Sequence, residues 1–247
     1  MPEVSKPPSA IHLCLSALSV PGRSTSLALH APFATGGATT DRQLIMADKT
    51  QSCLVPYVDI DKVPADLAAA ITRLPYRRNI FYLLGHSHGA FPPLMSTYAA
   101  FFDGKKRTLP LLDWQLVVLR ISATLDAEYE WEVNSPVARI NGMPESKLDA
   151  LKQTARKGRA AIEAEPEFSV RDRAILGLVD EQLDTYNNTE ETVARAKTLL
   201  SVEELVEVYI VIGLYVLIAR ITKGLRIDLD GDIPGLEDSL KKVVTSG

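Results

Sequence analysis

One acidic residue set between two aromatic ones is the strongest candidate for chemistry in this sequence. Glu130 follows Tyr129 and precedes Trp131, and Asn134 comes four residues later. On a continuous helix, Glu130 and Asn134 share one face. A carboxylate in an apolar, aromatic pocket has a raised pKa and can exchange protons with a carbon acid or an enol near neutral pH. This pattern therefore indicates acid–base chemistry.

A structural explanation of the same residues stays open. Glu130 can form an ion pair with Arg120 or Arg139, leaving Tyr129 and Trp131 as ordinary core packing. Structural ion pairs are common around buried acids, so the sequence does not favour one explanation over the other.

We expect no metal site and no other cofactor. His86 and His88 have a spacing that suits a metal, but no neighbouring helix or strand supplies further ligands. The run from Asp228 to Asp232 resembles the start of a calcium loop. Its sixth position is Ile233 and its twelfth is Ser239, where such a loop needs Gly and Glu.

The elements that must position Glu130 are helices. Prolines, small polar residues and a terminal Gly224 mark their ends. We expect helices over 65–74, 79–84, 94–102, 111–125, 128–140 and 145–156. Three more are opened by the boxes Ser169–Asp172, Asn188–Glu191 and Ser201–Glu204. Pro136 predicts a kink in the 128–140 helix. Residues 225–229 can form one short extended piece, and the chain is otherwise all-α.

Composition excludes several classes of protein. The 247 residues are 46% hydrophobic and carry a net charge of −4, so no basic surface indicates nucleic acid or an anionic membrane. The segment Leu205–Ile221 is almost wholly apolar, but it contains Glu207 and is short for a bilayer. It is typical of a core or subunit-interface helix. Cys14 and Cys53 form no CxxC and no disulfide framework, which suits the cytoplasm.

Residues 1–45 differ from the rest of the chain. They are rich in Ser, Pro, Thr, Ala and Gly and show no sustained periodicity. They carry weak features of a signal or transit peptide without the expected flanks. We expect these residues to be a disordered tail, or to result from a start codon upstream of the natural one at Met46. A single helical domain over 46–247 follows.

The stretch 111–142, LLDWQLVVLRISATLDAEYEWEVNSPVARING, resembles the carboxymuconolactone decarboxylase and alkylhydroperoxidase D-like family. The resemblance is to the branch that carries Tyr-Glu-Trp in place of the thiol motif, and it extends over most of residues 55–232. It implies an alkylhydroperoxidase D-like helical bundle.

The redox members of that family use a glutamate, two cysteines one helical turn apart and a histidine one turn further on. Residue by residue, this chain has Gln115 at the glutamate, Ala127 and Glu130 at the cysteines, and Asn134 at the histidine. Tyr129 stands where a further histidine is common. The comparison therefore argues against a thiol peroxidase.

Two functions remain. The first is a decarboxylase, isomerase or cyclase acting on a small organic acid, lactone or polyketide-like substrate. Glu130 would transfer the proton, and Tyr129, Gln115 and Asn134 would donate hydrogen bonds to a developing enolate. Trp131 and Arg120 would bind the substrate.

The second function is a small-molecule binder or assembly partner that has lost catalysis. In either case, relatives and the apolar helix lead us to expect a homo-oligomer, which could be a dimer, trimer or hexamer.

Overall fold

The computed structural model describes residues 52–74, 76–233 and 235–236. These residues form ten α-helices and one short 3-10 helix, η1 (Ile60–Lys62), with no strand among them. The α-helices are α2 (Ala65–Ile71), α3 (Asn79–Leu84), α4 (Phe91–Phe102), α5 (Leu111–Leu125), α6 (Glu128–Ile140), α7 (Glu145–Thr154), α8 (Arg159–Ala164), α9 (Val170–Thr185), α10 (Glu190–Lys197) and α11 (Val202–Gly224). The all-α prediction is confirmed, while the predicted tail and Met46 lie outside the described residues.

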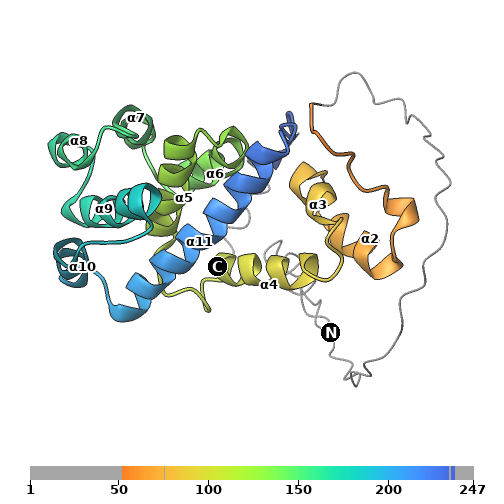
Figure 1. The fold of residues 1–247 in the computed structure, drawn as a ribbon, viewed down its shortest axis with the longest axis horizontal. Coiled ribbons are helices and arrows are strands. Elements are labelled where there is room, and N and C mark those ends of the chain that lie inside the picture. Colours follow the sequence, from red (N-terminus) through yellow and green to blue (C-terminus); the bar gives the residue numbers. More distant parts are fainter. Residues whose placement is uncertain (1–51, 75, 234, 237–247) are drawn as a thin grey trace, which may run out of the picture.

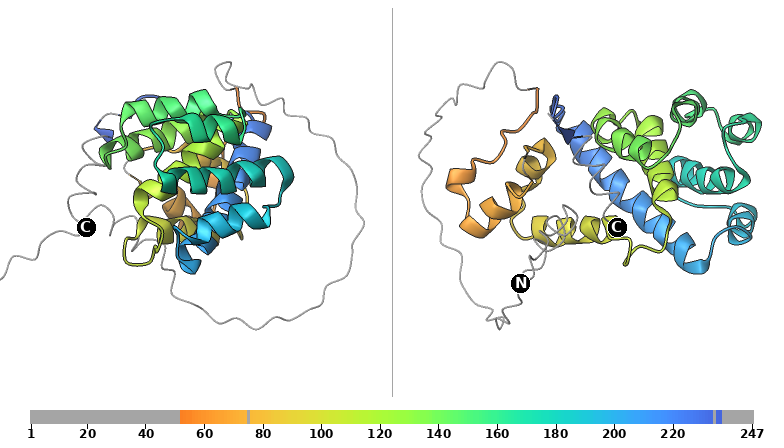
Figure 2. Two further views of the ribbon diagram at one scale, coloured as in Figure 1. Left: turned by 90° about the vertical axis from the view of Figure 1, so that its left-hand side faces the viewer. Right: turned by 180° about the vertical axis from the view of Figure 1, so that it is seen from behind.

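Helix α5 is the centre of the bundle. It packs against α6, α7, α9 and α11, and α11 also contacts α6, α9 and α10. Helices α7 to α10 lie on one side of this centre and α2 and α3 on the other, with α4 running between the two sides (Figure 1). The same division is visible from behind (Figure 2). The two long apolar helices α5 and α11 therefore hold the protein together.

Two apolar cores meet on α11. The larger core surrounds α5, and the smaller one is formed by α2, α3 and α4 with Ile218 of α11. Tyr98 of α4 packs against both cores and donates a 2.8 Å hydrogen bond to the carbonyl of Leu214. By length and composition α11 could cross a membrane, but it packs against α5, α6, α9 and α10, is hydrogen-bonded to α4, and has 39% of its most apolar window buried. The prediction of a core helix accounts for that buried part.

Helix starts follow local sequence signals with two corrections. Ser169 and Ser201 form the predicted capping boxes. Helix α4 begins at Phe91 rather than at residue 94, because prolines in a first turn lose no hydrogen bond. Helix α10 is capped by Thr189, since Asn188 instead donates to the carbonyl of Leu178.

The other differences concern short segments. Helix α8 was not predicted. Helices α2 and α7 end two to three residues earlier than expected, at Ile71 and Thr154. Residues 225–229 form no strand. Helix α6 runs without a break through Pro136.

Arg120 is a structural residue in this fold. Its side chain is fully buried and forms an ion pair with Asp180 of α9, with an Nη2–Oδ2 distance of 2.6 Å. The remaining guanidinium donors bind Asp180 Oδ1, Thr154 Oγ1 and the carbonyls of Leu151 and Thr154. All five N–H groups are used to join α5, α7 and α9, so none remains for the substrate-binding role that the sequence suggested.

We expect Asp180→Asn to lower the free energy of unfolding by roughly 3 kcal/mol, because it leaves the Arg120 cation buried without a counter-charge. Denaturant unfolding measures this change. Glu145→Gln, which breaks the exposed Arg139–Glu145 pair, is the matched control and should cost less than about 1 kcal/mol. Equal losses in the two variants would contradict the structural role of Arg120.

Candidate functional site

Glu130 lies in the first turn of α6, and its side chain points inward against α11. The residue is 3% exposed. Its Oε1 accepts a 2.7 Å hydrogen bond from Thr222 Oγ1, and its Oε2 is buried with no hydrogen-bond partner among the described residues. Neither predicted arginine reaches it, because Arg120 binds Asp180 and Arg139 binds Glu145. The carboxyl group is therefore buried without a paired cation.

This environment raises the pKa of Glu130 above its ordinary value of 4.5. Burial is the largest cause, and the Thr222 hydrogen bond and the charge of Lys223 offset it only in part. Thr222 Oγ1 also lies 3.0 Å from the carbonyl of Ile218. A protonated Glu130 can donate to Thr222 while the threonine proton goes to that carbonyl, so the neutral acid fits the site.

Tyr129 points away from Glu130, toward α3 and the segment after α11. Its hydroxyl donates to both carboxylate oxygens of Asp230, at 3.0 and 2.9 Å, and accepts a 3.2 Å hydrogen bond from the Ile80 amide. Burial, followed by the Asp230 charge, raises the pKa of Tyr129. The phenol stays neutral and is fully hydrogen-bonded within the protein.

Asp230 is a buried junction that the sequence did not reveal. Besides Tyr129, it binds the Arg78 guanidinium at 2.9 Å and the Asn79 amide at 2.7 Å. The Asn79 side chain donates to the carbonyls of Asp228 and Leu229. The acidic run that we rejected as a calcium loop thus fastens the segment after α11 to α3 and α6.

Gln115 and Asn134 are both buried, but their side-chain amides differ in hydrogen bonding. The Gln115 side chain is fully buried in α5, and both of its amide atoms lack a hydrogen-bond partner within the described part of the chain. Asn134 donates a 2.8 Å hydrogen bond to the backbone carbonyl of Glu130. An unpaired buried amide costs free energy, and Gln115 lines neither of the two cavities that border α11.

Trp131 faces the large core instead of the Glu130 carboxyl. It packs within that core, and the Lys152 ammonium of α7 lies 4.2 Å from the centre of its ring. The contact is a cation–π interaction between helices. Trp131 therefore contributes packing at the position where the sequence suggested substrate binding.

Two tyrosines that the sequence did not single out as site residues lie close enough to Glu130 to sense its charge. Burial, together with the charge of Glu130, raises the pKa of Tyr98 on α4 and of Tyr215 on α11. Their rings meet edge to face at 5.8 Å, and Tyr215 also meets Trp114 at 6.2 Å. Aromatic residues therefore lie near the buried acid, although they are not the flanking pair that the sequence suggested.

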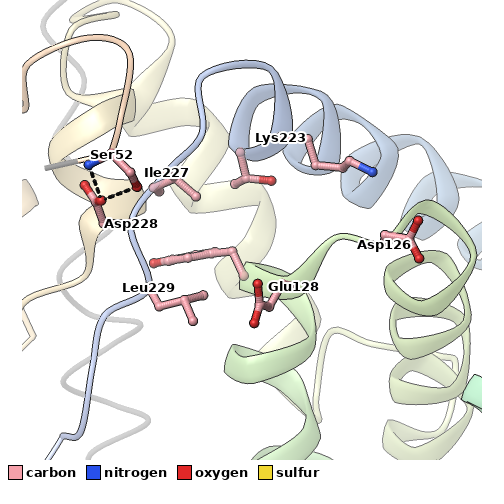
Figure 3. Close-up of a pocket in the computed structure, with 9 residues that line it drawn as sticks. Ser52, Asp126, Glu128, Lys223, Ile227, Asp228 and Leu229 are labelled. Carbon is pink, nitrogen blue, oxygen red and sulfur yellow. Dashed lines mark hydrogen bonds between the residues drawn. The ribbon is translucent and has the colours of Figure 1, made fainter.

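An open pocket of about 320 Å³ lies beside Glu130. Thr222 and Tyr129 line it, and the segment Ile227–Leu229 faces Glu128 across it (Figure 3). Asp126 and Lys223 border the same opening (Figure 3). Thr222 is the link between this pocket and the buried acid.

No cluster of three or more potential metal ligands occurs in the described residues. His86 Nε2 lies 2.7 Å from the carbonyl oxygen of Pro56, to which it can only donate, and His88 is exposed. The donor set gives no basis for a metal in this site.

Comparison with known proteins is informative at the level of structure. No family model and no curated protein matches the sequence. A solved protein of unknown function from Agrobacterium tumefaciens, described as a candidate antioxidant defence protein AhpD, matches with a TM-score of 0.51 at 20% identity. The match covers 59% of this chain and 94% of that one.

A second solved structure, the alkylhydroperoxidase AhpD core of an uncharacterised peroxidase-related protein from Ralstonia eutropha, matches with a TM-score of 0.58 at 16% identity. The match covers 71% of this chain and 92% of the Ralstonia chain. This chain has the alkylhydroperoxidase D-like fold. The fold expected from the resemblance is thus confirmed.

In this alkylhydroperoxidase D-like fold, the two positions predicted to replace a thiol pair occupy the start of α6. Ala127 is the buried N-cap residue and Glu130 is one turn further along. Cys53, the cysteine in the described part of the chain, is half-buried and lies outside the bundle helices. A dithiol at the start of α6 is therefore absent from this protein.

As the pH rises above 4.5, the free energy of unfolding of wild type should fall relative to that of Glu130→Gln. A raised folded-state pKa means that the folded protein holds the proton longer than the unfolded chain, so wild-type stability falls between the two pKa values. The slope is at most about 1.4 kcal/mol per pH unit. Urea unfolding from pH 4 to 8 measures it.

Glu132→Gln, an exposed site on the same helix, controls for the loss of one charge from α6. A difference between wild type and Glu130→Gln that stays constant with pH would contradict the raised pKa.

Proposed function

We propose that this protein is an acid–base enzyme without thiol chemistry, of the decarboxylase, isomerase or cyclase type, in which Glu130 transfers the proton. The observation that supports the proposal is the Glu130 carboxyl group. It is buried, has no cation paired with it, and leaves one oxygen without a partner beside a pocket. Catalytic acids and bases are commonly found in such environments.

The chemical step is a proton transfer at carbon. Ionised Glu130 removes a proton next to a substrate carbonyl, and the electron pair moves to the carbonyl oxygen to give an enolate. Return of the proton from Glu130 to another carbon completes an isomerisation. We propose the Gln115 amide, which has no partner in the described residues, as the donor to that oxygen; Gln115 does not line the pocket, so the substrate would have to reach it in the interior. Tyr129 would first have to release Asp230.

Charge in the pocket indicates the kind of substrate. Three carboxylates, Asp126, Glu128 and Asp228, line it together with one cation, Lys223. A substrate with its own carboxylate would meet net negative charge there. Among the substrates suggested by the sequence, we therefore propose a neutral lactone or a polyketide-like ketone.

Hydrogen–deuterium exchange tests the proton transfer before the full reaction is known. We expect the protein to exchange the protons next to the carbonyl of neutral lactones or ketones in D2O, measured by NMR. Glu130→Gln should slow this exchange at least about 100-fold, because general acid–base catalysis contributes that much. Its melting temperature should stay at or above that of wild type.

Glu132→Gln is again the matched control and should keep full exchange activity. Equal exchange by wild type and Glu130→Gln would eliminate the assignment. Consumption of an organic peroxide with a dithiol reductant would also contradict a non-thiol mechanism.

A second candidate function is a binder that retains the fold without catalysis. Two observations favour it: Glu130 does not itself line the pocket, and the Tyr129 hydroxyl is already used within the protein. A ligand that raises the melting temperature of wild type and Glu130→Gln equally, without exchange in either, would support this alternative.

We further propose that the protein is a homo-oligomer that buries one face of α11. Val202, Val206, Ile210 and Leu217 are exposed, large and apolar, and they follow one another at helical spacing. A contiguous apolar stripe of this kind is typical of an interface between subunits.

Light scattering tests the oligomer. We expect a mass of at least two chains at micromolar concentration. Ile210→Glu should lower that mass by placing a charge in the interface. Val170→Glu, at an exposed apolar residue in the first turn of α9, is the control. A monomeric wild type would contradict the proposal. With the apolar stripe covered by a second chain, we expect the protein in the cytoplasm rather than in a membrane.

A further inference from the structure

A second cavity lies on another side of α11. It has a volume of about 430 Å³ and runs between α11 and the end of α9. Leu183, Ile212, Val216 and Ala219 give it apolar walls. The volume is in the range of small-molecule sites, which combine apolar walls with a few polar groups.

The polar groups in this groove are unlike those of the pocket beside Glu130. Arg220 and Lys223 line one end, and the lining includes no carboxylate. Within the described residues, neither cation forms an ion pair with an acid. Arg220 approaches the Tyr186 hydroxyl at 3.3 Å, and Lys223 donates to the carbonyl of Leu125. A cation near a helix C-terminus is favoured by the helix dipole, which is the competing reason for their presence.

The opposite end of the groove is lined by neutral groups, and Glu181 lies close enough behind them for its charge to raise the pKa of Tyr209. The Tyr209 hydroxyl and the Gln182 amide both donate to Asn188 Oδ1, at 2.9 and 2.8 Å. Tyr209 and Arg220 are separated by about 16 Å along the axis of α11. The groove is therefore an elongated apolar channel with positive charge at one end only.

We propose that this groove binds an amphipathic carboxylate, with its apolar body along α11 and its carboxylate on Arg220 and Lys223. Apolar contact with α9 and α11 supplies affinity, and the two cations orient the ligand. A neutral molecule of the same shape lacks the second interaction. This proposal does not depend on the proposed function, because Glu130 lies outside the groove.

Lys223 connects the groove to the candidate site. It lines both cavities, and its charge lowers the pKa of Glu130. A carboxylate bound to Lys223 would neutralise that charge and raise the pKa of Glu130 further. Occupation of the groove would thus change the protonation of the buried acid.

A second copy of the chain is the competing occupant. Gly213 borders the groove on the side of the apolar stripe Val202, Val206, Ile210 and Leu217. The cations at one end favour the small carboxylate, because the stripe itself carries no charge to meet them. The oligomer mass separates the two occupants.

The test uses the full chain and a fluorescent fatty-acid probe, 11-(dansylamino)undecanoate, displaced by decanoate or by decan-1-ol. We expect one saturable site per chain and a preference for decanoate. Arg220→Gln should weaken decanoate binding about tenfold, the effect of one lost charge-assisted hydrogen bond, and leave decanol unchanged. Lys197→Gln, an exposed cation on α10, is the matched control.

Gly213→Leu should abolish binding by filling the groove. A Cβ added at Gly213 meets no atom within 4 Å, so the fold should tolerate the change. Because coupling between two sites is reciprocal, Glu130→Gln should bind decanoate no more weakly than wild type does, so loss of proton exchange with probe binding retained keeps this test separate from the catalytic one. Three outcomes would each overturn the proposal. The first is equal affinity of the wild type for decanoate and decanol, and the second is normal probe binding by Gly213→Leu. The third is no probe binding together with a lower oligomer mass in Gly213→Leu.

Discussion

The hydrogen bond between Glu130 and Thr222 is the constraint on which the candidate site depends. It joins α6 to α11 in the interior of the bundle and holds a carboxyl group that forms no ion pair within the described residues, although the charge of Lys223 offsets its burial in part. An isolated ionised carboxylate in such a place is costly, so the group is held toward its neutral form. Glu130 therefore keeps its proton to a higher pH than an exposed glutamate does.

The surrounding structure keeps this group in position from two directions. Arg120 uses all of its donors to hold α5 against α7 and α9, which fixes one side of the α5–α6 pair. On the other side, Asp230 accepts hydrogen bonds from Tyr129 and the Asn79 backbone amide and forms an ion pair with Arg78. These two buried junctions leave little freedom to the start of α6, where Glu130 lies. Pre-organisation of this kind is what a proton-transferring residue requires.

Charge divides the surface around α11 into two parts. The pocket beside Thr222 has an excess of carboxylates, whereas the groove along α9 has cations and no acid in its lining. Lys223 belongs to both and is also close enough to affect Glu130. Two ligands of different charge could therefore occupy neighbouring sites, and one of them would act on the other through a single lysine.

The sequence by itself determined the helices and the candidate acid. The helices over 111–125 and 128–140 and the capping boxes at Ser169 and Ser201 follow from local signals, since capping and periodicity act over a few residues. The Tyr-Glu-Trp stretch indicated Glu130 and argued against a dithiol. Local signals were weakest at the short helix α8 and at the start of α4.

Only the tertiary structure decided which side chains surround that acid. Thr222 is 92 positions from Glu130, and Asp230 is 101 from Tyr129, so no local pattern relates them. The same packing pairs Arg120 with Asp180 and buries Trp131 in the large core. Side-chain partners between helices depend on how complete helices pack, and that arrangement comes from the whole apolar core rather than from any short stretch of sequence.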